Sequence, residues 1–195
     1  MFKTDIISSV WYIAQKYSIN IAHASHIEKL ALNIFDHTGI IHRLGERERN
    51  YLQVAAILHD VGKFIDLNQH EEQCYNIIHF ENIIGFSDKD LDMAANVARY
   101  HGEDIPSLAH YNYGRLSYKD KIVVSKLASI LKIADALDIS SKQKVDKIEI
   151  SIDNDEVYFI ISSHEDTLLE EWSFKNNAEF FQEVMGIKPI IKTKR

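Results

Sequence analysis

Histidines and aspartates recur at positions where a helix would face a protein core. The pair His59-Asp60 follows the apolar run "VAAIL", and His23, His101 and Asp135 each lie on an apolar stripe of their own helix. Imidazole nitrogens and carboxylate oxygens together suit iron, manganese, zinc or magnesium. A buried carboxylate such as Asp135 also needs a positive partner, which a divalent ion would provide. The pattern therefore predicts a metal site.

His70 adds a further donor, because it shares a helix face with Cys74 and Ile77. Asp60 follows His59 and points about 100° round the helix, so its carboxylate is placed to bind one ion or to bridge two. The alternative reading is structural, since a single histidine on an apolar face is usually a hydrogen-bonded core residue. The coincidence of several donors, each in phase with its helix, adds weight to a metal site, and periodicity alone leaves both readings open. We interpret the remaining histidines as surface or structural: His26, His37, His42, His79, His110 and His164.

Hydrophobic periodicity predicts the helices that would position these donors. They cover residues 5–17, 21–38, 46–61, 69–81, 87–101 and 119–138. Asn20 is the expected N-cap of the second helix, and "SDKD" is a capping box formed by Ser87 and Asp90. Residues 102–117, which include Pro106, are expected to form a loop.

The pattern changes after residue 140. The stretches "KIEISID" and "EVYFIIS" alternate with period 2 around Asn154-Asp155, which predicts a β-hairpin. A helix over 177–185 and a short strand in "KPIIK" are expected to follow. We therefore predict a mainly α fold with two parts, a helical domain over residues 1–140 and a small α+β unit over residues 141–195.

Composition narrows the class of protein. The 195 residues are 46% hydrophobic and carry a formal net charge of −7, and no basic stripe dominates, which argues against nucleic acid as a partner. No apolar run of membrane-spanning length occurs, so no membrane partner is expected. Cys74 is the only cysteine and has no partner for an internal disulfide. A reducing, cytoplasmic location is the expectation.

The order of the donors resembles a known superfamily. "LHDVGK" and "LKIADALD", with His23 upstream, are similar to the HD domain of metal-dependent phosphohydrolases. The stretches "AHASHIEKLALNIFD", "RYHGEDIP", "LEEW" and "AEFFQEVMG" resemble the C-terminal region of the exopolyphosphatase / guanosine pentaphosphate phosphohydrolase family. The resemblance covers nearly the whole chain and implies an HD-type helical bundle.

The resemblance also assigns roles. It implies that His23, His59, Asp60 and Asp135 bind the metal, and that His70 and His101 are candidates for a second metal site. Asp60 would also be catalytic, together with Lys63 of the HD-x-G-K motif and Arg99, which would face phosphate. The sequence departs from the family pattern in two ways, of which the first bears on the second metal site and the second weighs against a direct transfer of activity. "HEEQC" replaces a His-rich stretch, and the two N-terminal actin-like domains of full-length relatives are missing from this sequence.

Two functions remain open at this stage. The first is a metal-dependent phosphohydrolase that acts on a phosphorylated small molecule, with a nucleotide or polyphosphate among the candidates. It would use a divalent ion, namely Mn, Fe, Mg or Zn. The second is a non-catalytic HD module for ligand binding, regulation or dimerisation, and a homodimer is among the expected assemblies. The sequence names neither the substrate nor the metal.

Overall fold

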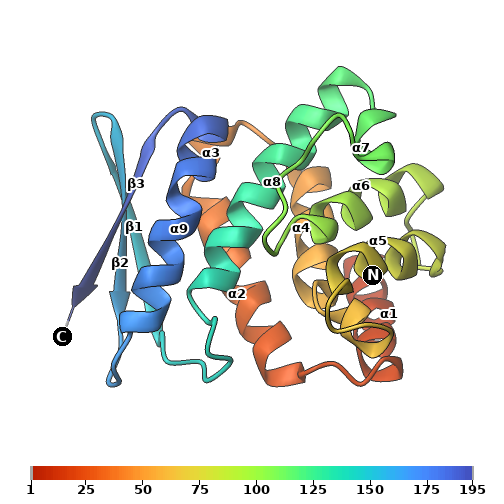
Figure 1. Ribbon diagram of the computed structural model, residues 1–195, viewed down its shortest axis with the longest axis horizontal. Helices are drawn as coiled ribbons and strands as arrows, with labels where there is room; N and C mark the ends of the chain where they lie inside the picture. The colour runs from red at the N-terminus through yellow and green to blue at the C-terminus, as the bar shows by residue number, and fades with distance from the viewer. Residues whose placement is uncertain (1, 195) are drawn as a thin grey trace.

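Helix α4 (Glu46–Leu58) is the central element of the helical part of the protein. In the computed structural model, which describes residues 2–194, every residue from Tyr51 to Leu58 is buried. Helices α1, α2, α6 and α8 all pack against α4 (Figure 1). The C-terminal end of α4 therefore lies deep in the core, and it delivers His59 and Asp60 there.

The surrounding long helices lie close to their predicted ranges. They are α1 (Phe2–Lys16), α2 (Ile21–His37), α5 (His70–Phe80), α6 (Asp88–Arg99) and α8 (Tyr118–Ala136). The side chain of Asn20 accepts a hydrogen bond from the backbone N–H of His23, as expected of an N-cap. Ser87 and Asp90 form the predicted capping box at the start of α6. Local capping thus fixes where two of the site-bearing helices begin.

Three helical details differ from the prediction. Helix α4 ends at Leu58 rather than at residue 61, and a 3-10 helix, η1 (Val61–Phe64), follows after a turn at His59 and Asp60. A short helix, α7 (Tyr111–Gly114), lies in the segment predicted as a loop, and α3 (Gly39–His42) follows α2. Segments this short carry too few apolar residues for a helical period to be read from the sequence.

The C-terminal part contains the predicted hairpin and strand. Strands β1 (Lys147–Asp153) and β2 (Glu156–Ser162) pair antiparallel, with Asp153 opposite Glu156. The turn between them contains Asn154, whose φ of 51° is left-handed, a conformation that asparagine tolerates better than most residues. Strand β3 (Lys188–Lys194) pairs parallel to β2, so the strand order is β1-β2-β3.

Helix α9 (Leu168–Met185) begins nine residues before the predicted start at residue 177. Its buried face includes Glu170 and Ser173 in the first turns, followed by Phe174 and Phe181. The two polar residues interrupt the apolar period, which explains why the sequence pattern located only the second half of the helix. The ring of Phe159 on β2 contacts both phenylalanines and so fixes α9 on the sheet.

Figure 1 shows α9 between the sheet and α8, so the molecule is layered as sheet, helix and helical bundle. The predicted fold class, mainly α with a C-terminal α+β part, is confirmed. The division into domains 1–140 and 141–195 stays a prediction. Within residues 2–194, no helix combines the length and apolar character needed to cross a membrane.

Candidate metal centre

The turn after α4 places a histidine and an aspartate side by side at the centre of the fold. His59 is fully buried and Asp60 is 8% exposed. The Nδ1 of His59 lies 2.8 Å from the carbonyl oxygen of Ala56, and because a carbonyl only accepts, Nδ1 carries the proton. The lone pair of Nε2 is thereby directed away from the helix. A fixed tautomer of this kind is typical of metal-binding histidines.

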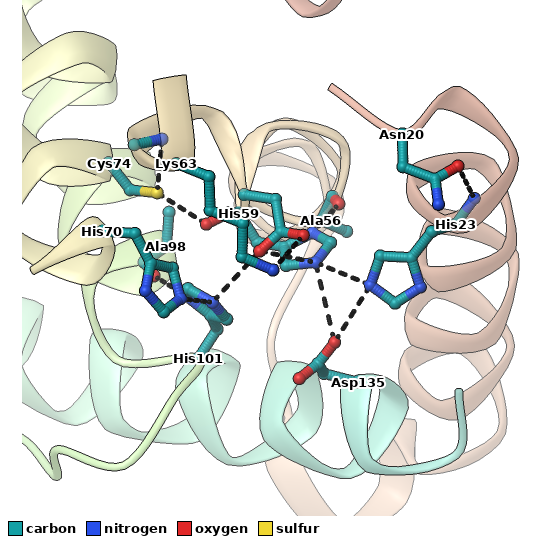
Figure 2. Close-up of polar contacts among 12 residues, drawn as sticks. Asn20, His23, Ala56, His59, Lys63, His70, Cys74, Ala98, His101 and Asp135 are labelled. Carbon is teal, nitrogen blue, oxygen red and sulfur yellow. Dashed lines mark hydrogen bonds and ion pairs between the residues drawn. The ribbon is translucent and has the colours of Figure 1, made fainter. Parts of the chain in front are cut away.

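Four predicted residues meet around this lone pair. The Nε2 atoms of His23 and His59 are 3.1 Å apart (Figure 2). The Oδ1 of Asp135 lies 3.3 Å from Nε2 of His23 and 3.6 Å from Nε2 of His59. The Oδ1 of Asp60 is 3.6 Å from Nε2 of His59. We call His23, His59, Asp60 and Asp135 the inner group.

A second set of donors lies on the other side of Asp60. The Nε2 atoms of His70 and His101 are 3.3 Å apart (Figure 2), and Nε2 of His101 lies 3.7 Å from Oδ1 of Asp60. Their Nδ1 atoms face the carbonyl oxygens of Leu67 and Ala98, at 3.2 and 2.7 Å. We call Asp60, His70 and His101 the outer group. Asp60 belongs to both groups, so its carboxylate is placed to bridge two ions.

The chemistry of the inner group fits a cation. Both imidazole Nδ1 atoms make hydrogen bonds elsewhere, so two Nε2 lone pairs face each other across 3.1 Å in a buried site. Such an arrangement needs a proton or a metal ion between the nitrogens. Two neighbouring carboxylates supply the negative charge that a divalent ion requires. Nitrogen and oxygen donors together suit Mn, Fe or Zn, and Mg less well.

Electrostatics distinguishes the two groups. Burial lowers the pKa of His23, but hydrogen bonds to Asp135 and Asp138 outweigh it and raise the pKa to about 9. Burial and the neighbouring His59 lower the pKa of His101 to about 4. For Asp60, burial raises the pKa, and the nearby histidines outweigh this and hold it below its ordinary value. At neutral pH Asp60 is therefore a carboxylate and His101 a neutral imidazole. His23 instead carries a proton, which an ion bound at its Nε2 would have to displace.

Asp138 is a part of the site that sequence reasoning missed. Its Oδ2 lies 2.8 Å from Nδ1 of His23, and it is fully buried. Gln143 donates to it from both the backbone N–H (2.6 Å) and the side chain (3.0 Å). A carboxylate behind a metal-binding histidine orients the ring and makes it a better donor. The signal was present, since Asp138 follows Asp135 by three residues, in the turn directly after α8.

The turn is held close to α5 by a small residue and a thiol. A Cβ on Gly62 would lie only 2.0 Å from the carbonyl oxygen of His70. The Cys74 thiol donates to the His59 carbonyl (2.6 Å) and accepts from the Gly62 N–H (3.1 Å). Gly62 does not end a helix, because α4 has already ended at Leu58. The absence of a side chain at Gly62 allows the close approach instead.

A cleft of about 950 Å³ opens above both groups. Lys63 and Arg99, the predicted phosphate-facing cations, both line it. The Nζ of Lys63 lies 2.7 Å from Oδ2 of Asp60, and Nη2 of Arg99 donates to Asp104 at 3.0 Å. Each cation is therefore adjacent to the cleft and paired with a carboxylate.

Lys132 is a second residue that sequence reasoning missed. It is 3% exposed, lies one turn before Asp135 on α8, and donates from Nζ to the carbonyl of Gly102. Burial lowers the pKa of its ammonium group. Because Gly102 follows His101, this bond helps to hold the loop that carries an outer-group ligand.

The six histidines interpreted as surface or structural all lie outside the lining of this cleft. His42 is buried and bonds the backbone at Phe35 and Leu44, which is a structural role. His79 lies beside Asp92, and His110 stacks on Tyr100.

A mainly α protein with two nitrogen–oxygen donor groups under a cleft has the features of a metal-binding helical domain. Comparison with known protein families gives a match over residues 7–178 to the family described as Ppx/GppA phosphatase, domain III. The matched range contains every donor of both groups and the first half of α9. The chain belongs to this family.

Proposed function

We propose that this chain is a metal-dependent phosphohydrolase of the HD type that acts on a phosphorylated small molecule. The observation that carries the proposal is the convergence of two donor groups on one shared carboxylate, Asp60, at the floor of a cleft. Membership of a phosphatase family supports it, as does the donor order His, His-Asp, Asp along the chain.

The proposed roles follow from the geometry. His23, His59, Asp60 and Asp135 would hold one divalent ion, and Asp60 with His70 and His101 would hold a second. Mn, Fe, Mg or Zn bound there would lower the pKa of a bound water and offset the charge that develops on phosphorus.

Lys63 and Arg99 would bind the phosphate oxygens of the substrate. Both cations are now paired with carboxylates, so a phosphate would have to exchange with Asp60 at Lys63 and with Asp104 at Arg99. Such exchange is feasible because the Lys63 side chain is 45% exposed and the Asp104 side chain is 51% exposed.

A second function, a non-catalytic module for ligand binding, regulation or dimerisation, is favoured by one observation. The description of the matched family refers to domain III of a phosphatase, and such a domain is one part of a larger protein. In that case the donor groups would bind an ion or a ligand without turnover.

A turnover experiment separates the two functions. The purified chain is stripped of metal with a chelator, reloaded with Mn, Fe, Mg or Zn, and assayed on a panel of phosphate esters. The proposal predicts phosphate release that depends on the added ion and is lost in Asp60→Asn. Stoichiometric metal binding with no release from any ester would instead establish the non-catalytic module.

A further inference from the structure

One part of the cleft lining has no role in metal binding. Helix α9 contributes Trp172, Ser173, Asn176 and Asn177. Trp172 is 60% exposed, an unusual position for an indole, and Asn176 lies one turn further along and is also exposed. The helix behind them is anchored on the sheet through Phe174 and Phe181. The indole is therefore presented to the cleft by a rigid element.

Two apolar side chains extend this surface. Ile139, in the turn after α8, is 43% exposed, and Leu67, before α5, is 72% exposed. Both line the same cleft as Trp172. An aromatic ring with exposed aliphatic neighbours can stack on the face of a flat ring in a ligand. The side-chain amide of Asn176 can donate and accept hydrogen bonds at the edge of that ligand ring.

The charge of the cleft limits the number of phosphate groups that a bound ligand can have. Its lining contains two basic residues, Lys63 and Arg99, and six acidic ones: Asp60, Glu71, Glu72, Glu103, Asp104 and Asp135. Two divalent ions would bring the sum of these formal charges to zero. A single phosphate group is then accommodated, whereas a chain of phosphates would place further negative charge beside Glu72 and Glu103, which are exposed.

We infer that the substrate is a phosphate monoester bearing one flat ring, of the nucleoside monophosphate type, and that Trp172 selects it by stacking on that ring. This inference rests on the proposed function, because it places the phosphate at the two donor groups. Cleft volume agrees with it, since about 950 Å³ lies within the range of sites for small organic ligands. The same arrangement of charges disfavours polyphosphate as a substrate.

The test compares esters with and without a ring. The ratio of kcat/KM for adenosine 5′-monophosphate to that for β-glycerophosphate is measured for the wild type and for Trp172→Leu. Loss of one stacking partner is expected to lower this ratio by about 10-fold. Trp11→Phe is the matched control, because Trp11 packs against the core from α1 and is the only other tryptophan. An unchanged ratio in Trp172→Leu would overturn the inference.

A binding measurement gives a readout without turnover. In Trp11→Phe, Trp172 is the sole tryptophan, so adenosine 5′-monophosphate should quench its fluorescence and ribose 5-phosphate should not. Equal quenching by both ligands would show that the ring makes no contact with the indole.

Tripolyphosphate tests the charge argument. The wild type should hydrolyse it less efficiently than the monoester, and Glu72→Gln with Glu103→Gln should raise its kcat/KM by up to about fivefold. Preference of the wild type for tripolyphosphate would refute the inference. If no ester of the panel, these two included, is hydrolysed with any metal, the proposed function itself fails, which is a distinct result.

Discussion

The two donor groups share Asp60 but differ in what stands behind their histidines. In the inner group, His23 is backed by the buried carboxylate of Asp138, and His59 is fully buried. In the outer group, backbone carbonyls stand behind both imidazoles, and the His70 side chain is 18% exposed. Additional negative charge and deeper burial favour a firmly held cation. If both groups bind ions as proposed, the comparison predicts a tight inner ion and a weaker outer one.

Removal of the shared carboxylate should have the largest effect. Asp60→Asn keeps the shape of the side chain but deletes the negative charge that both groups use. Loss of a residue that only hydrogen-bonds to a metal ligand typically lowers metal affinity 10- to 100-fold. Because Asp60 is itself a proposed ligand, the affinity at both positions should fall by more than that. Metal content after dialysis and the phosphatase rate measure the loss.

The matched control for Asp60→Asn is Asp92→Asn. Asp92 bonds Tyr75 and Arg115 outside the cleft, so its loss should lower the melting temperature and leave metal content unchanged. Full metal content in Asp60→Asn would remove the shared ligand and with it the two-group arrangement.

Single histidine variants separate the groups. His23→Ala should weaken the tighter binding event in a manganese titration by roughly 100-fold, because a direct ligand is lost. His70→Ala should weaken only the second event and leave the first dissociation constant within about threefold. If His70→Ala affects the first event as strongly as His23→Ala does, the groups are not ranked as proposed.

Asp138→Asn tests the feature that distinguishes the inner group. Neutralisation of the carboxylate behind His23 should reduce the affinity of the tighter ion by about 10- to 100-fold. The weaker ion, whose histidines face carbonyls, should bind as in the wild type. Isothermal titration calorimetry that resolves the two binding events measures both dissociation constants. Equal weakening of both ions would contradict the comparison.

Gly62→Ala should have the smallest effect on the inner group. The added methyl would meet the His70 backbone, so the turn or α5 must shift, and overpacking of this kind costs about 1–3 kcal/mol of unfolding free energy. The shift moves His70 and so weakens the outer ion. Gly39→Ala is the control, because a Cβ added there meets no atom of the described residues within 4 Å. Denaturant unfolding of both variants measures the difference, and equal stability would refute the close-packing role.

Hydrophobic periodicity was enough to find the site residues that lie on an apolar face of their helix. His59 and Asp135 lie on apolar stripes, and the structure brings them together. Asp138 was missed because a late aspartate in a helix is usually solvated, and only the tertiary fold places His23 beside it. The first half of α9 was missed because Glu170 and Ser173 occupy its buried face. The contact of Gly62 with α5 depends on backbone proximity, which no residue pattern encodes.

Helix α9 is also the crossover between the parallel strands β2 and β3, and this sets an order of assembly. All six proposed donors precede residue 136, whereas the cleft residues of α9 follow the hairpin, and β3 follows α9. Chains fold from the N-terminus as they are synthesised. All six donors are therefore synthesised before the α9 side of the cleft. An ion bound by these donors would stabilise the helical part by mass action, whereas the proposed selection by Trp172 also requires α9 in its place on the sheet.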